Sequence, residues 1–247
     1  MKKRADVLLV ERGLTESRTR AQAMIMAGSV YSGERRVAKP GDSLAEDAPL
    51  RVVEPPRFVS RGGDKLEGAL REFSALGLDV AGKIAVDVGA STGGFTDCLL
   101  QRGAAKVYAV DVGWGQLHAK LRADARVVVM ERTNARDLTR QSFGEAVDLV
   151  VVDASFIGLG KLVPAIGGLL DGGGELVALV KPQFEAGREE VTRGRGVIRD
   201  EAVRASAVAH ALSDVELAGF SVLGGVDSSI LGPKGNREHL VYARKRL

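Results

Sequence analysis

Four charged residues stand far apart in this chain, and each lies where a parallel-sheet fold brings side chains to its ligand crevice: Lys65, Asp153, Lys181 and Glu238. Asp153 and Lys181 follow apolar strands, Glu238 precedes the last strand, and Lys65 is expected on a helix. Because the carboxyl ends of parallel strands line one crevice, these side chains can converge. Two lysines beside two carboxylates are suited to taking a proton from a weakly acidic hydroxyl, such as that of a ribose.

Within this group, Lys181 is the expected proton acceptor. Burial and the nearby Lys65 cation favour the neutral amine that this role needs, whereas Asp153 orients the amine and opposes neutrality. Glu238 is expected to position Lys65 or the ribose. A single lysine or aspartate at a strand end is more often an ordinary surface charge, so the catalytic interpretation needs all four residues together.

A Gly-rich turn follows the first long apolar strand, in the run KIAVDVGASTGGFTD at residues 83–97. Its spacing differs from the G-x-G-x-x-G pattern of dinucleotide-binding folds, and an acidic residue near the strand end suits the cationic amine of S-adenosylmethionine. We expect Asp87 to face that amine, directly or through water. The other residues expected to hold the cofactor here are Gly89, Ser91, Gly93, Gly94 and Phe95.

The adenosine half of the cofactor is expected at the ends of the following strands. Asp111 ends the strand at 106–111, where nucleotide-binding α/β folds hydrogen-bond the ribose hydroxyls, although the same residue would also suit NAD. Asn134 follows the strand at 127–130 and is a candidate contact for adenine. Asp153 is expected in the cofactor site as well as in the catalytic group.

The elements that position these residues predict two domains. Strands are expected at 83–88, 106–111, 127–130, 147–152, 174–180, 220–224 and 240–244, with an amphipathic helix at 200–217. They predict an α/β fold with a Rossmann-like, seven-stranded class I methyltransferase sheet over residues 65–247. Residues 1–56 predict a small α+β module with two helices, the second capped by Thr15 or Ser17. Residues 57–64 are the expected linker, stiffened by Pro55 and Pro56 just before it.

Basic charge is concentrated at the N-terminal end. The chain has 35 Lys and Arg against 32 Asp and Glu, a formal net charge of +3, and residues 1–57 account for that excess. An excess of this size is common on solvated surfaces, so charge alone indicates RNA only weakly. At 188–200, arginines interleaved with glycines form either a mobile loop that closes over RNA, through Arg193 and Arg195, or a solvated surface loop.

Several other chemistries are disfavoured. Cys98 is the sole cysteine, so an internal disulfide is excluded. A base C5-methyltransferase needs a nucleophilic cysteine in its active site, whereas Cys98 is expected in the core, away from the strand ends. Asp153-Ala154-Ser155-Phe156 lacks the two prolines usual in exocyclic-amine methyltransferases. The three histidines have no ligand spacing, so no metal is expected. Without a long apolar segment or signal peptide, the expectation is a cytoplasmic protein with no membrane contact, of unknown oligomeric state.

The N-terminal module resembles the RNA-binding domain of ribosomal small-subunit protein four. The resemblance rests on the runs LVERG, SRTRAQ and AGSVY within residues 8–31. In that family, exposed arginines of the second helix and of the basic turn after it grip structured RNA. With one further arginine near the N-terminus, the candidate RNA contacts of the module are Arg4, Arg18, Arg20, Arg35 and Arg36.

The whole chain resembles the TlyA family of hemolysin-like rRNA methyltransferases, whose catalytic domain is of the FtsJ type. The four charged residues match the Lys-Asp-Lys-Glu tetrad of that domain, and the runs SRGGDKL, DVGASTGGF, VKPQF and GPKGN follow in the family's order. The resemblance implies S-adenosylmethionine-dependent 2'-O-methylation of cytidine in ribosomal RNA. Phe58 stands where some members carry tryptophan. It is expected either to be an ordinary linker residue or to stack on RNA and so transmit RNA binding between the domains.

Two other functions remain open from the sequence. A non-catalytic RNA-binding factor for ribosome assembly would share both domains, and methyl transfer would distinguish it. A membrane-active protein is suggested only by the hemolysin name, and the absence of a strongly apolar amphipathic segment disfavours it.

Overall fold

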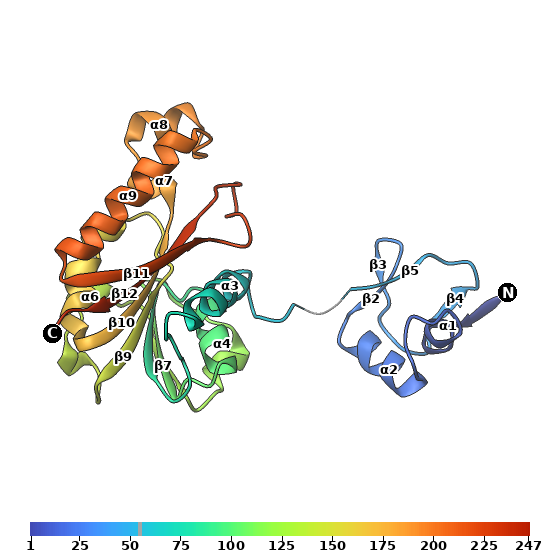
Figure 1. Cartoon of the computed structure of the whole chain (residues 1–247). Helices are drawn as coiled ribbons and strands as arrows, with labels where there is room; N and C mark the ends of the chain where they lie inside the picture. Colours follow the sequence, from blue (N-terminus) through green and yellow to red (C-terminus); the bar gives the residue numbers. More distant parts are fainter. Residues whose placement is uncertain (54–55) are drawn as a thin grey trace. The chain divides into compact units, whose positions relative to one another are not determined.

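The computed structural model describes residues 1–53 and 56–247. The chain forms two compact units, Met1–Arg57 and Phe58–Leu247 (Figure 1). Pro55, which was expected to stiffen the junction, lies outside the described residues.

The N-terminal unit packs two helices against short strands. A small core of apolar residues, including Leu9 and Ile25, lies between them. Helix α2 begins after Ser17, whose hydroxyl accepts a hydrogen bond from the backbone N–H of Arg20, so Ser17 rather than Thr15 is the cap. The elements are β1 (Lys2–Arg4), α1 (Ala5–Glu11), α2 (Arg18–Met26), β2 (Val30–Ser32), β3 (Arg35–Arg36), β4 (Ser43–Ala45) and β5 (Leu50–Val52).

The larger unit is built on a seven-stranded sheet in the order β11-β12-β10-β9-β6-β7-β8. Strand β12 runs antiparallel to both of its neighbours, and the other pairs are parallel. The predicted α/β class and its seven strands are confirmed. The strands are β6 (Ile84–Val88), β7 (Lys106–Val110), β8 (Val127–Met130), β9 (Val147–Val152), β10 (Leu170–Val180), β11 (Phe220–Asp227) and β12 (His239–Lys245).

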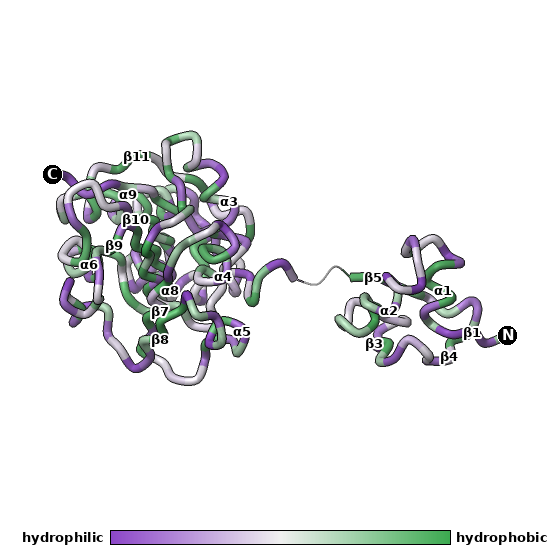
Figure 2. Tube along the Cα trace, turned by 90° about the horizontal axis from the view of Figure 1, so that it is seen from below, coloured by the Kyte–Doolittle hydropathy of each residue, from purple (hydrophilic) through white to green (hydrophobic). Residues whose placement is uncertain are grey.

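Helices cover both faces of this sheet, as Figure 1 shows. Side chains alternate along each strand, so Ala85 belongs to the core beside α3 and α4, and Val86 to the core beside α6 and α9. Figure 2 shows the resulting hydrophobic run along the central strands. The helices are α3 (Gly62–Ser74), α4 (Gly94–Gln101), α5 (Ala119–Arg122), α6 (Val163–Leu169), α7 (Pro182–Glu185), α8 (Arg188–Arg193) and α9 (Glu201–Leu217), with 3-10 turns η1 (Ala135–Asp137), η2 (Arg140–Ser142) and η3 (Leu159–Lys161).

Two segments differ from expectation. Residues 188–193 form helix α8, so only the second half of the predicted arginine loop is irregular. Phe58 is 3% exposed and packs in the core of the larger unit, which excludes stacking on RNA in this conformation. The backbone N–H of Val59 donates to the buried carboxylate of Asp97 on α4, so this stretch is fixed to the larger unit at that helix.

Candidate active site

A cavity of about 580 Å³ opens at the carboxyl ends of the central strands, and all four charged residues line it. Asp153 directly follows β9, and Lys181 directly follows β10. Because β12 is antiparallel, with His239 paired to Val180, its first residues lie at the same sheet edge, and this brings Glu238 to the cavity. Helix α3 supplies Lys65.

The four residues form two separate ion pairs. Lys65 Nζ lies 2.5 Å from Glu238 Oε2, and both side chains are buried. Lys181 Nζ lies 2.6 Å from Asp153 Oδ1 and donates to the Ser155 hydroxyl at 2.9 Å. Each lysine is therefore held at a defined place on the cavity wall by a carboxylate from a different element.

Close backbone packing shapes the floor between these pairs. Gly89 has φ +84°, and a Cβ there would lie 2.9 Å from the carbonyl oxygen of Asp153. A Cβ on Gly94 would lie 2.3 Å from Ser60 Oγ and 2.8 Å from the backbone nitrogen of Gly63. Glycine is therefore required where the turn meets β9 and where α4 meets the start of α3. Phe95 is buried beside this floor and lines the cavity.

A second cavity, of about 570 Å³, shares Gly89, Ser91 and Asp153 with the first. Asp111 and Asn134, both predicted to contact adenosine, line it. The carboxylate of Asp111 accepts hydrogen bonds from the backbone nitrogens of Ser91 and Gly113, each at 2.7 Å, and so joins the turns after β6 and β7. The two cavities adjoin at these shared residues and are here together called the trough.

Two predicted cofactor residues lie elsewhere. Gly93 is buried, and a Cβ there would lie 2.2 Å from Leu121 Cδ1, so it allows α5 to pack and does not line either cavity. Asp87 is fully buried behind the floor, where Oδ2 accepts from the backbone N–H and the hydroxyl of Thr96. Burial, with a smaller contribution from Asp153, raises the pKa of Asp87 to about 7 against the opposing effect of Thr96.

Hydrogen-bond acceptors without a donor gather at this site. Most buried polar atoms in proteins have a partner, so those without one point to a missing ligand or water. Among the described residues, five buried side-chain oxygens have none, and all except Thr15 Oγ1 lie in or directly behind the trough: Asp87 Oδ1, Asp153 Oδ1, Gln183 Oε1 and Glu238 Oε1. Although Asp153 Oδ1 is close to Lys181 Nζ, that contact is an ion pair without hydrogen-bond geometry. The trough is therefore suited to ligands that carry ammonium or hydroxyl donors.

Sequence reasoning did not select the aromatic residues at the cavity mouth. Phe156 is 91% exposed, has φ +66° and lines both cavities. Its ring centroid lies 5.5 Å from that of Phe184. Ser155, the hydrogen-bond partner of Lys181, was missed as well. The sequence offered a signal for the two aromatic residues and for Ser155, because each comes within three positions of a catalytic candidate at a strand end.

The candidate RNA contacts of the N-terminal unit have two environments. Arg4 and Arg18 form ion pairs with Asp6, which is fully buried, yet their own side chains are 52% and 57% exposed. The Arg4 hydrogen bonds hold the pKa of Asp6 well below its usual range. The other candidates, Arg20, Arg35 and Arg36, are exposed.

In the larger unit, Arg193 and Arg195 are both exposed near the cavity rim formed by Val191 and Gly196. Arg193 contacts Glu190 at 3.2 Å. Neither arginine lines the cavity itself.

Comparisons with known proteins agree with this geometry. The sequence model of the FtsJ-like methyltransferases matches residues 58–245. The 16S/23S rRNA (cytidine-2'-O)-methyltransferase TlyA of Mycobacterium tuberculosis is 45% identical over 98% of this chain and 89% of its own. Hemolysin A of Brachyspira hyodysenteriae is 43% identical over 97% of this chain and 98% of its own. A solved structure described as a hemolysin, from Streptococcus thermophilus, has a TM-score of 0.74 at 42% identity and covers 99% of this chain and 89% of its own.

The fold is thus that of a class I methyltransferase. The chain belongs to the FtsJ-like methyltransferase family and, within it, to the group of the TlyA proteins.

Proposed function

We propose that this protein transfers a methyl group from S-adenosylmethionine to the 2'-hydroxyl of a cytidine in ribosomal RNA. The observation that carries the proposal is the convergence of two lysine–carboxylate pairs on one cavity at the strand ends: Lys65 with Glu238, which are both buried, and buried Lys181 with the partly exposed Asp153. The name of the Mycobacterium tuberculosis relative supports the substrate and the position of the methyl group.

The residues of the trough fit S-adenosylmethionine. Asp111 and Asn134 would hold the adenosine in the second cavity, and the turn at Gly89 and Ser91 would pass close to the ligand. The orphaned oxygen of Asp87 behind the floor would favour the methionine ammonium through its charge or a bridging water. When bound, the cofactor supplies an electrophilic methyl group on a sulfonium that leaves as a neutral thioether.

The tetrad would prepare the accepting hydroxyl. The unpartnered Oε1 of Glu238 can accept a hydrogen bond from a ribose hydroxyl, while Lys65 fixes the other oxygen of that carboxylate. While the bound cofactor would supply the methyl group, Lys181 would accept the proton that the 2'-hydroxyl gives up. Asp153 then stabilises the new ammonium. Holding the oxygen in line with the methyl group supplies the remaining acceleration.

The N-terminal unit, proposed here as an RNA-binding domain over residues 1–56, would hold the substrate. Its exposed arginines offer phosphate contacts that position RNA without reading its sequence. Arg193 and Arg195 lie beside the cavity rim and could add contacts close to the methylated nucleotide.

The direct test is methyl transfer to ribosomal subunits that lack their native methylation, with wild type beside Lys181→Ala. We expect label on a ribose oxygen with wild type and a loss of at least about a hundredfold for the variant, with cofactor affinity retained. Label on a base would contradict the role of the tetrad. RNA binding by wild type without any transfer would instead favour the alternative of a non-catalytic assembly factor.

A membrane-active function has no comparable support. Among residues 1–53 and 56–247, no helix combines the length and apolar character needed to cross a bilayer.

The same residues contain no group of three His, Cys, Asp or Glu side chains that could hold a metal ion.

A further inference from the structure

Two segments from distant parts of the chain form the cavity wall beside Glu238. The first, residues 186–200, is here called the arginine segment and contributes Val191 and Gly196 to the wall. The second, residues 228–238, is here called the β11–β12 loop and contributes Pro233, Lys234 and Glu238. The position of Glu238 therefore depends on how these two segments hold each other.

The side chain of Asn236 joins them by two hydrogen bonds. The Nδ2 amide of Asn236 donates to the carbonyl oxygen of Gly196 at 2.9 Å, and its Oδ1 accepts from the backbone N–H of Ile198 at 2.9 Å. Asn236 is 2% exposed, so water does not compete readily for these bonds. The bonds need one donor and one acceptor on a short side chain, which an asparagine amide provides.

The same residue is tied to Glu238 through its own loop. The carbonyl oxygen of Asn236 accepts from the backbone N–H of Gly232 at 2.9 Å. A Cβ on Gly232 would lie 2.5 Å from Glu238 Oε1, so the backbone at Gly232 lies directly against that carboxylate. A shift of Asn236 would consequently move the wall behind Glu238, and with it the partner of Lys65.

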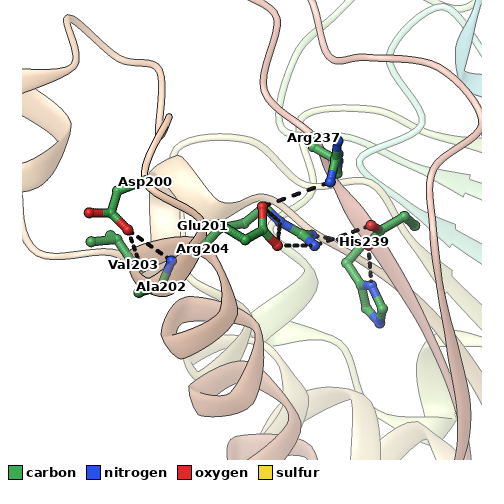
Figure 3. Close-up of polar contacts among 8 residues, drawn as sticks. Asp200, Glu201, Ala202, Val203, Arg204, Arg237 and His239 are labelled. Carbon is green, nitrogen blue, oxygen red and sulfur yellow. Dashed lines mark hydrogen bonds and ion pairs between the residues drawn. The ribbon is translucent and has the colours of Figure 1, made fainter.

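One end of each segment is held at the start of α9, as Figure 3 shows. Asp200 ends the arginine segment and caps α9 by accepting from the backbone of Ala202. Arg204 on α9 pairs with Asp227 at the end of β11, at 3.0 Å. Beside it, Arg237 lies 3.8 Å from Glu201. Loss of the Asn236 bonds would therefore free the middle of the arginine segment, while its end at Asp200 stays attached to α9.

We infer that Asn236 is a positioning residue for methyl transfer: its amide latches the arginine segment to the β11–β12 loop and so holds Glu238 beside Lys65. The inference rests on the proposed function for the role of Glu238. It also assigns a purpose to the irregular turn at Arg195 and Gly196, whose φ values of +51° and +86° bring the Gly196 carbonyl to the latch.

The test compares Asn236→Ala and Asn236→Asp with wild type and with Arg237→Ala, whose exposed side chain neighbours the latch without taking part in it. Methyl transfer to ribosomal subunits, cofactor affinity, thermal midpoint and the rate of tryptic cleavage within residues 188–199 are measured on the full chain. The aspartate keeps the shape and the acceptor for Ile198 but places an oxygen against the carbonyl of Gly196.

We expect both Asn236 variants to lower kcat by about tenfold or more, to cleave faster within the arginine segment, and to keep the cofactor affinity of wild type. The thermal midpoint should fall by only a few degrees, because the buried backbone partners of Asn236 lose hydrogen bonds while the core is untouched. Arg237→Ala should behave as wild type in every measurement. Unchanged kcat, unchanged cleavage, full activity of Asn236→Asp, or loss of cofactor binding and global stability would each overturn the inference. Failure of the proposed function would show itself separately, as absence of ribose methylation by wild type.

Discussion

At the scale of single residues, Asp87 is the most informative group behind the site. The pKa of its buried carboxyl lies at about 7, so below that pH the protein without ligand holds this group mainly neutral. A cationic amine on the other side of the cavity floor favours the carboxylate instead. Cofactor binding should therefore be coupled to the release of a proton from Asp87.

We predict that the affinity for S-adenosylmethionine rises with pH up to about 7 and then levels off as far as Asp87 is concerned. Affinity rises with pH because, below about 7, Asp87 must lose its proton when the cofactor binds, which costs free energy. Above that pH Asp87 is already ionised and the cost disappears. Calorimetric titrations in buffers of different ionisation enthalpy measure both affinity and proton release. Asp87→Asn, which cannot ionise, should bind more weakly and lose this pH dependence; an unchanged profile would show that Asp87 does not sense the ligand.

Phe156 combines full exposure with a left-handed backbone that is unfavourable for a bulky residue. Such conformations cost on the order of 1–3 kcal/mol and persist where surrounding structure enforces them, often at functional sites. Its place at the mouth of both cavities gives it an apolar face toward an incoming nucleotide.

We predict that Phe156→Gly raises the free energy of unfolding by about 1 kcal/mol, because glycine adopts positive φ without strain, and yet lowers RNA methylation. Denaturant unfolding and kcat/KM on ribosomal subunits measure the two effects. Phe156→Tyr keeps the aromatic face and should retain most activity. Equal losses for Tyr and Gly would mean that the ring face has no part in substrate binding.

At the scale of elements, the contact between α3 and α4 sets the distance from Lys65 to the Gly-rich turn. Gly94 is the point of closest approach, where its Cα faces Ser60 and the backbone of Gly62 and Gly63. The neighbouring hydrogen bond from Val59 to Asp97 holds the same stretch from the other side. Any side chain at Gly94 must push these elements apart.

We predict that Gly94→Ala destabilises the protein by about 1–3 kcal/mol through this overpacking and weakens cofactor binding, since Gly94 lines the cavity. Gly168→Ala is the matched control, because a Cβ there meets no atom within 4 Å in helix α6. It should be neutral or stabilising. Thermal unfolding with and without S-adenosylmethionine measures both effects, and equal behaviour of the two variants would contradict the tight contact.

At the scale of the whole molecule, the chain couples a basic N-terminal unit to a methyltransferase unit. We expect the phosphate contacts of the first unit to provide RNA affinity, while the trough of the second unit binds the cofactor and carries out the chemistry. Because the two units have separate hydrophobic cores, charge on the first unit can be changed without altering the core of the second.

We predict that Arg20→Glu, Arg35→Glu and Arg36→Glu together weaken RNA binding and reduce the salt dependence of log Kd by roughly 0.7–0.9 for each phosphate that the protein no longer neutralises. Cofactor affinity should not change. Binding to ribosomal RNA across a range of salt concentrations measures the slope. If the slope stays at the wild-type value, these arginines do not bind phosphate. Lys2→Glu, an exposed charge change outside the candidate set, is the control.

Local patterns in the sequence were enough to predict most of the elements and the residues at their ends. Continuous apolar runs identify the strands of a parallel sheet, and side chains just after such strands must lie at one edge of it. For that reason Asp153 and Lys181 could be placed at the crevice without coordinates. The short strands β1 and β4 escaped prediction because their residues, KKR and SLA, are mostly polar and form no apolar run.

Which of these residues contact each other became clear only from the three-dimensional packing. Sequence left open whether Glu238 contacts Lys65 or the substrate, and the antiparallel register of β12 places it against Lys65. Only packing showed that Gly93 faces α5, that Phe58 is buried, and that Asn236 bridges two loops. The physical reason is that strand and helix patterns are encoded by neighbours along the chain, whereas pairing partners are set by sheet order and by loops whose contacts are distant in sequence.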